Sequence, residues 1–194
     1  MINFPTTFND QLTKLSAPEI EAKDFEVWSG LTPEYAAQIT GIAQEPSILE
    51  YCPNDSASRF MDIPAVERWL AKDRGAFLLI KRDDDTLTLA GYGWTGPEAS
   101  DHVDGGKTTF ALRISERYQG LGLATPFAAV IIGASIDLYG ATNFWLETWQ
   151  SNAAAVHVYH KLGFTDVAAT PSERLTKDGI LVPDTRLYMT LANT

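Results

Sequence analysis

Two glycines separated by one residue lie where an alternating strand-like pattern gives way to an apolar helical pattern. The segment reads Ile114-Ser115-Glu116-Arg117-Tyr118-Gln119-Gly120-Leu121-Gly122-Leu123-Ala124. The first N–H groups of a helix have no partner within it and lie at the positive end of its dipole, so they can bind a phosphate. Gly120, Gly122 and Ala124 leave room for such a ligand, and Pro126 removes no helix bond in the first turn. The segment predicts a pyrophosphate site or, since such turns also form for packing alone, a plain strand-to-helix turn.

Two better-known phosphate motifs are excluded here. No Gly-Lys-Ser/Thr follows the turn, so it is not a P-loop, and the three glycines of the dinucleotide-binding pattern are absent.

A second polar group stands at the next strand-to-helix boundary. Asn152 begins the helix, and Tyr159 shares a helical face with it, about 10 Å further along. Glu147 precedes both in the strand. Each residue also has an ordinary role, because Asn152 is a good helix cap, Tyr159 a possible core aromatic and Glu147 a possible exposed strand residue.

Other reactive side chains suggest no further chemistry. His157 and His160 lack Cys or Asp neighbours at a metal-ligand spacing, so we expect no metal site. Cys52 is the one cysteine of the chain, which excludes an internal disulfide and fits a reducing compartment. A lone cysteine could be a nucleophile, but we expect its thiol to be buried or partly buried and inert.

The elements that position these residues follow from apolar periodicity and from proline and glycine breaks. The expected helices are 33–43, 64–72, 123–139 and 152–162. The expected strands are 76–81, 87–95, 108–114, 143–149 and 184–191. We expect loops at 44–62 and 96–106 and a charged turn at 82–85. For residues 1–35 the sequence does not decide whether strands form.

Strands interleaved with helices predict an α/β (α+β) domain with a mixed sheet. Residues 108–149 form a strand, a glycine turn, a helix and a strand, which predicts a crossover between parallel neighbours. No linker or repeat divides residues 1–194, so one domain is expected.

Composition limits the partners. Hydrophobic residues make up 45% of the chain and charged residues 21%, enough for a core. The net charge of −10 disfavours nucleic acid and would attract cationic ligands, or it serves solubility alone. Met1 to Asp10 lack a secretory signal, and the longest apolar run, 123–136, is too short to span a membrane. We therefore expect a cytoplasmic protein with no membrane partner; nothing decides between a monomer and a homodimer.

Taken together, the two segments resemble the GNAT superfamily of N-acetyltransferases. Gln119-x-x-Gly122-x-Ala124 is similar to the family's pyrophosphate motif. Asn152-x-x-Ala155-x-x-x-Tyr159-x-x-x-Gly163-Phe164 is similar to its later segment. The resemblance covers residues 76–167, the expected acetyl-CoA-binding core, and leaves residues 1–75 as the variable acceptor-side part.

The resemblance implies a GNAT-type mixed, splayed β-sheet flanked by helices, with acetyl-CoA as cosubstrate between strands 108–114 and 143–149. It implies that main-chain groups of the first strand hold the pantetheine arm, that amides of the glycine turn hold the pyrophosphate, and that Asn152 contacts one of these arms. The implied cofactor-binding residues are Leu112, Arg113, Ile114, Gln119, Gly120, Leu121, Gly122, Leu123, Ala124, Thr125, Asn152 and Tyr159.

Glu147 and Tyr159 further resemble the ribosomal-protein N-terminal acetyltransferases, where the glutamate is the base and the tyrosine the acid. Glu98 and His102 remain alternative bases. Two residues depart from the family pattern: Glu116 replaces a common proline, and Gln119 replaces the more usual arginine. Candidate acceptor-binding residues are Trp28, Tyr35, Tyr51, Trp94, Trp149, Asp101 and Asp104.

The resulting hypothesis is an acyltransferase that moves an acetyl group from acetyl-CoA to a primary amine by direct attack. The acceptor is expected to be a small cationic amine or a peptide N-terminus. An acyl-CoA-binding regulatory module without turnover is the alternative, and a nucleotide-binding or structural α/β domain is a third.

Overall fold

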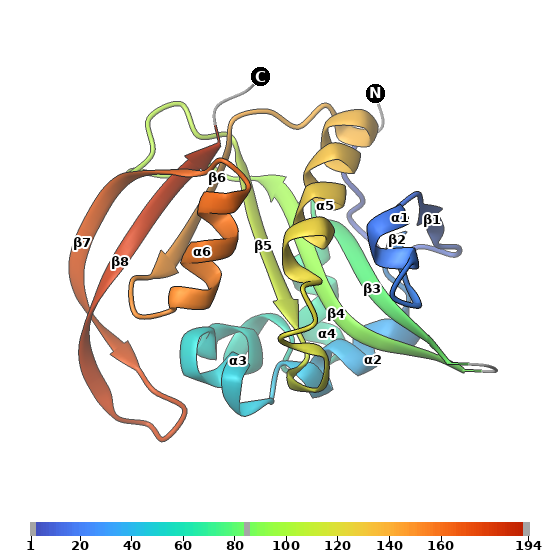
Figure 1. Cartoon of the computed structure of the whole chain (residues 1–194), viewed down its shortest axis with the longest axis horizontal. Coiled ribbons are helices and arrows are strands. Elements are labelled where there is room, and N and C mark those ends of the chain that lie inside the picture. Colours follow the sequence, from blue (N-terminus) through green and yellow to red (C-terminus); the bar gives the residue numbers. More distant parts are fainter. Residues whose placement is uncertain (1–2, 84–85, 192–194) are drawn as a thin grey trace.

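A mixed sheet in the order β1-β2-β3-β4-β5-β6-β8-β7 runs through the molecule (Figure 1). The structure, a computed structural model, describes residues 3–83 and 86–191. The strands are β1 Thr13–Leu15, β2 Phe25–Ser29, β3 Gly75–Asp83, β4 Thr86–Pro97, β5 Thr108–Ile114, β6 Phe144–Trp149, β7 Thr165–Leu175 and β8 Leu181–Leu191. Of the neighbouring pairs, β5 and β6 are parallel and the others antiparallel.

Helices cover both faces of this sheet. They are α1 Pro18–Glu21, α2 Pro33–Ile42, α3 Pro46–Tyr51, α4 Ile63–Leu70, α5 Ala124–Tyr139 and α6 Ala153–Lys161, with a π-helical turn η1 at Asp55–Arg59 and a 3-10 turn η2 at Glu116–Tyr118. Residues of α1, α5 and α6 belong to one apolar core, and residues of α2, α3 and α4 belong to another on the opposite face. We call these the cofactor face and the acceptor face, after the roles predicted for them from the sequence.

Local sequence explains where the main helices begin and end. The side chain of Asp62 accepts a hydrogen bond from the Ala65 N–H at 2.8 Å, and Thr32 caps α2 in the same way. Gly140, at φ 66°, ends α5 in the left-handed conformation that glycine adopts freely. The four predicted helices and the hairpin of β3 and β4 are confirmed.

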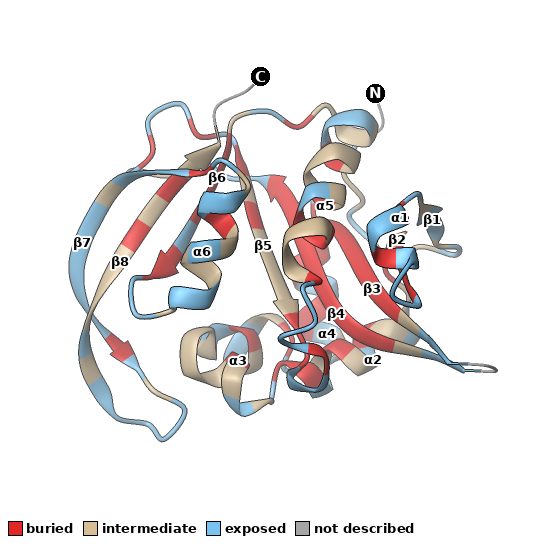
Figure 2. Ribbon diagram, in the orientation of Figure 1, coloured by how far each residue is buried: buried red, intermediate tan, exposed pale blue. Residues whose placement is uncertain are grey.

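The central strands are buried on both sides, as Figure 2 shows for β3 and β4. Phe77 and Leu79 enter the core of the cofactor face, whereas Leu78 and Ile80 enter that of the acceptor face. This double burial is why the sequence of β3 is continuously apolar rather than alternating.

The sheet opens between β5 and β6. Within the described residues, the two strands pair only at Thr108↔Phe144 and Thr109↔Trp145. Residues 110–114 then run on without a strand partner on that side. The predicted parallel neighbours and the mixed, splayed sheet are therefore confirmed.

The prediction of a loop at 44–62 was wrong, because α3 and η1 lie there. Pro46 and Pro53 were taken as breaks, but Pro46 occupies the first turn of α3, where it is tolerated. Ile48, Asp55 and Phe60 are buried, so contacts with distant residues hold this segment in helical turns.

Three strands were not predicted. β7 alternates poorly because most of its residues are exposed and it pairs with β8 alone among the described strands. β8 begins at Leu181, earlier than expected, and β1 and β2 lie in the N-terminal part that was left open. Of the charged turn predicted at 82–85, residues 84–85 lie outside the described residues. No helix in the described ranges is long and apolar enough to cross a membrane.

Candidate active site

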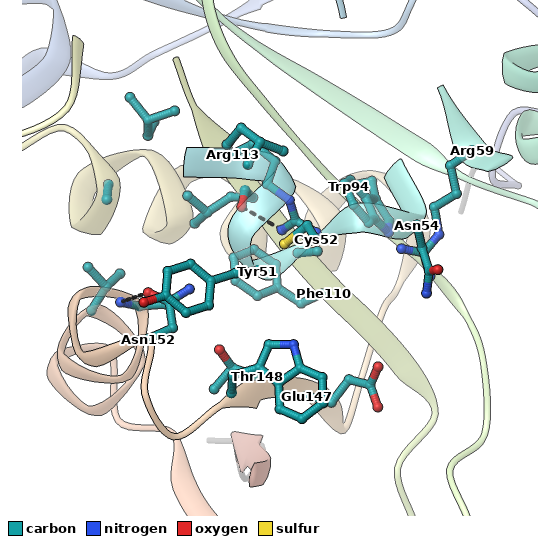
Figure 3. Close-up of a pocket in the computed structure, with 18 of the residues that line it drawn as sticks. Tyr51, Cys52, Asn54, Arg59, Trp94, Phe110, Arg113, Glu147, Thr148 and Asn152 are labelled. Atoms are coloured by element: carbon teal, nitrogen blue, oxygen red, sulfur yellow. Dashed lines mark hydrogen bonds between the residues drawn. The ribbon is translucent and has the colours of Figure 1, made fainter. Parts of the chain in front are cut away.

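The splay between β5 and β6 opens into a cleft of about 1210 Å³. Its walls come from β4, β5 and β6, from the segment 47–74, from the glycine turn and from α6 (Figure 3). Both strand-to-helix turns singled out in the sequence therefore border one cavity, although α5 and β6 separate them along the chain.

The glycine turn has the geometry of an anion site. Gly120 and Gly122 have φ values of 75° and 68°, which other residues adopt only with strain. In the described part of the chain, no hydrogen bond is donated by the N–H groups from Gly120 to Thr125. Both glycines line the cleft, so unpaired amides border it where α5 begins.

Side chains fix the glycine turn from outside. The Lys23 Nζ donates to the Leu121 carbonyl at 2.6 Å. The Gln119 Nε2 donates to the Ile114 carbonyl at 2.9 Å and to the Ser47 Oγ at 3.0 Å. Gln119 thus braces the turn with its side chain.

Tyr118 adds an unpaired group beside this turn. The residue lines the cleft, and its hydroxyl oxygen is buried with no hydrogen-bond partner among the described residues. An orphaned buried hydroxyl is costly and indicates a ligand or water that completes it.

Tyr159 lies on the cofactor face, packed against Phe110 and Phe164 with ring centroids 6.2 and 5.9 Å away. Burial raises the pKa of Tyr159 to about 12, so the hydroxyl keeps its proton at neutral pH. A protonated tyrosine at the edge of a cleft can act as a general acid.

Glu147 lies on β6 and faces the other way. Leu146 belongs to the core of the cofactor face, so alternation along the strand directs Glu147 to the acceptor face. Its side chain lines the cleft, is 47% exposed, and lies 3.7 Å from the Arg186 Nη1. The Glu147 carboxylate and the Tyr159 hydroxyl therefore lie on opposite sides of the splayed gap.

The remaining predicted cofactor residues line the cleft, with one exception. Asn152 caps α6 by accepting the Ala155 N–H at 3.2 Å, and it borders the cavity as well. Lining residues also include Leu112, Arg113, Ile114, Gln119, Gly120, Gly122, Leu123, Ala124, Thr125 and Tyr159. The side chain of Leu121 points outward, 50% exposed, and Leu121 is not part of the lining.

The predicted acceptor residues divide into two groups. The cleft contains Tyr51, Trp94 and Trp149, whereas Trp28, Tyr35, Asp101 and Asp104 are not among its lining residues. The alternative base Glu98 also lines the cleft, and His102 does not. His102 instead stacks on Tyr188 with ring centroids 4.1 Å apart.

Sequence reasoning missed a buried ion cluster in the acceptor wall. Asp55, which is fully buried, accepts from the Arg113 Nε at 2.8 Å, from the Arg59 Nη1 at 3.1 Å and from the Tyr92 hydroxyl at 3.3 Å. Burial lowers the pKa of Arg113, but the negative charge of Asp55 and the neighbouring groups outweigh it and hold the pKa above its usual value. No short sequence pattern could predict the ion pair between Asp55 and Arg113, because 58 residues separate them.

Cys52 lies beside this cluster. It lines the cleft, and burial raises the pKa of its thiol despite the nearby charge of Arg113. The thiol form is therefore favoured, as expected for an inert cysteine.

Comparison with known proteins gives a family match. Residues 43–164 match the family model described as the acetyltransferase (GNAT) family. An N-alpha-acetyltransferase of Sulfurisphaera tokodaii is 33% identical over 57 residues, which cover 29% of this chain and 34% of that protein. The match therefore spans about a third of the length of that curated relative.

Solved structures share the fold. A spermidine N-acetyltransferase from Vibrio cholerae, solved with CoA and spermine, has a TM-score of 0.66 at 18% identity, covering 87% of this chain and 96% of its own. The ribosomal-protein-S5-alanine acetyltransferase of Vibrio fischeri has a TM-score of 0.68 at 13% identity, covering 95% and 97%.

Proposed function

This chain belongs to the GNAT acetyltransferase family, and we propose that it transfers an acetyl group from acetyl-CoA to a primary amine. The observation that carries the proposal is the meeting of unpaired turn amides, the splayed main chain of β5 and the buried Tyr159 in one cleft. The acceptor is expected among small amines and peptide N-termini.

The residues of the cleft fit the cosubstrate. The N–H groups from Gly120 to Thr125 suit the pyrophosphate, and the orphaned Tyr118 hydroxyl offers a further hydrogen bond beside them. Main-chain groups of Leu112 to Ile114 face the opening where β6 has diverged, and they suit the pantetheine amides. Bound there, acetyl-CoA supplies an acyl group already activated as a thioester.

Glu147 is our proposed base. A lysine-like amine with a pKa near 10.4 is only about 0.04% neutral at pH 7, so making it nucleophilic costs roughly 4.6 kcal/mol. Glu147, acting through a water, would take that proton, while an N-terminal amine with a pKa of about 7.7–8.0 needs less help.

The chemistry then balances without a covalent enzyme intermediate. The neutral nitrogen forms a bond to the acetyl carbon, and a β5 amide stabilises the negative charge on the carbonyl oxygen. As the C–S bond breaks, Tyr159 donates its proton to the departing thiolate. The second proton lost by the nitrogen passes through water to restore Tyr159, and Glu147 releases the first to solvent. Cys52 has no part in this sequence.

We also propose that residues 1–194 act as one domain, with 76–167 as the acetyl-CoA-binding core and 1–75 supplying the acceptor side. The placement of α3, η1 and α4 against the cleft supports this division.

Steady-state release of CoA thiol with a panel of amines tests the proposal. Tyr159→Phe should lower kcat about 100-fold or more, because it removes the hydroxyl that donates the proton. It should leave CoA affinity within about threefold, because the ring and its packing remain. CoA binding without release for any amine would favour a regulatory module, and full kcat in the variant would remove Tyr159 from this role.

A further inference from the structure

The cleft concentrates basic residues in an acidic protein. The chain has 15 Lys and Arg residues against 25 Asp and Glu. Eight of the 15 line the cleft, namely Arg59, Arg68, Lys72, Arg74, Arg113, Lys161, Arg174 and Arg186, alongside only two carboxylates, Glu98 and Glu147.

Carboxylates outside the cleft lining neutralise some of these positive charges. Asp55 pairs with Arg59 and Arg113, while Glu50 and Asp184 pair with Arg174. Eight basic against five acidic groups still leave a surplus of three positive charges. Lys161, at the end of α6, is on the cofactor face, so the rest of the surplus lies on the acceptor side.

Arg59 has donors to spare. Arg113 is 12% exposed and uses its Nε on Asp55 and its Nη1 on the Leu112 carbonyl. Arg59 is 42% exposed, and among the described residues its one hydrogen bond runs from Nη1 to Asp55. Figure 3 shows Arg59 beside Asn54 at the end of the cleft away from Asn152.

A second unsatisfied arginine lies near it. Arg74 is 7% exposed and lines the cleft, and its Nε has no hydrogen-bond partner in the described residues, although its Nη2 binds Glu98 at 2.9 Å. Burial lowers the pKa of Arg74, and the positive charge of Arg59 lowers it further against the opposing effect of Glu98. The Arg74 guanidinium lies over Gly96, where a Cβ would meet its Nη1, and the Arg59 guanidinium lies over Trp94, two residues earlier on the same face of β4. Both positive charges therefore border one stretch of the cleft wall, where they would attract an anion.

Trp94 fixes the position of Arg59. The guanidinium carbons of Arg113 and Arg59 lie 5.1 and 5.8 Å from its ring centroid. Phe60 and Trp69 support the ring edge-on at 5.7 Å. With these contacts Trp94 is only 5% exposed, so its ring orients the two guanidiniums and offers little free surface to a ligand.

We propose that the acceptor is a primary amine that also carries a carboxylate, bound by Arg59 beside Arg74. Free α-amino acids and short peptides share this chemistry. The inference rests on the proposed function and narrows it, because a polyamine would place additional positive charge in a cleft that already has a surplus.

The test compares each acceptor with its own carboxamide. CoA release is measured with L-phenylalanine, L-leucine and L-methionine, with their amides, with the dipeptide Leu-Phe and its amide, and with spermidine. The amine of an amino acid amide is less basic and more often neutral, so intrinsic reactivity favours the amide. A higher kcat/KM for the carboxylate form therefore reports recognition.

Arg59→Gln is the decisive variant, and Lys107→Gln is its control. Asp55 keeps Arg113 and Tyr92 as partners when Arg59 is lost, so the fold is retained. Lys107 is exposed and outside the cleft lining, and its replacement removes the same charge. We expect Arg59→Gln to reduce the ratio of kcat/KM for acid over amide about 10- to 100-fold, the usual weight of a charged hydrogen bond. Lys107→Gln should leave the ratio unchanged, and Arg59→Lys should restore part of it.

The outcomes separate the two proposals. Turnover of spermidine or the amides ahead of every carboxylate-bearing acceptor would uphold the acetyltransferase and overturn this inference. An unchanged acid-to-amide ratio in Arg59→Gln would overturn it as well. Preference for free amino acids over the dipeptide, or the reverse, identifies the source of the carboxylate. Failure of every amine to release CoA would overturn both proposals.

Discussion

Removal of the Asp55 carboxylate should destabilise the protein strongly. Asp55 is fully buried, and it holds Arg113, which is only 12% exposed, at 2.8 Å. In Asp55→Ala the guanidinium would stay in the wall without a counter-charge, and the Tyr92 hydroxyl would lose its partner. Breaking a buried pair in this way typically costs about 3–5 kcal/mol.

We expect about 3 kcal/mol, the lower end of that range, because Arg113 borders the cleft and can gain some hydration. For a chain of this length each kcal/mol lowers Tm by roughly 2–4 °C, so the fall should be roughly 6–12 °C. Thermal and urea melts measure it. Asp101→Ala, which alters an exposed loop carboxylate, is the control and should change Tm by less than about 2 °C.

A double variant tests the cause. Asp55→Ala combined with Arg113→Met removes both charges, and such replacements are often close to neutral, so it should be more stable than Asp55→Ala alone. A fall below about 2 °C in Asp55→Ala, or a double variant as unstable as the two single losses added, would refute the argument from an uncompensated buried charge.

Three further predictions concern the turn, the buried tyrosines and the base. Lys23→Met should weaken CoA binding about three- to tenfold by releasing the Leu121 carbonyl, measured by calorimetry, and an unchanged Kd would show that the turn needs no brace. Burial raises the pKa values of Tyr159 and Tyr92 above that of unfolded tyrosine, so the stability they contribute is complete below pH 10 and is lost as the pH rises through their folded values. Melts between pH 9 and 11.5 should therefore show a falling Tm that is shallower in Tyr159→Phe; equal slopes would contradict this. Glu147→Gln should lower kcat/KM about 10²-fold for an amine with a pKa near 10.4 and distinctly less for one near 8, and equal losses for the two amines would argue against a base.

The parts of the site that depend on short segments of sequence could be predicted. Gly120 and Gly122 are needed for a turn with positive φ, and Asn152 caps the helix that follows it, so short segments sufficed. The turn was found in this way, whereas the splayed strands and the placement of Tyr159 and Glu147 at the cleft followed from the resemblance to the GNAT family. The roles assigned to these residues stay predictions.

The acceptor wall could not be predicted, because it depends on contacts between distant segments. Asp55 lies in a stretch rich in prolines and polar residues. Its role as the buried partner of Arg113 and Tyr92 is visible only in the folded structure. The same reason applies to β7, whose exposed residues show no apolar alternation and whose partner β8 defines it. The composition could not predict the basic cleft either. The net charge of −10 is a sum over the whole chain and does not show where the positive residues gather.

Thermal melts of the protein alone and with acetyl-CoA, CoA or ATP test the central claim most directly. A ligand at 100 times its Kd adds about 2.7 kcal/mol, which for this chain corresponds to roughly 5–11 °C. We predict such a rise with acetyl-CoA and with CoA and none with ATP. If neither CoA species raises Tm, the glycine turn serves packing alone, and the assignment of this cleft to acetyl transfer is contradicted.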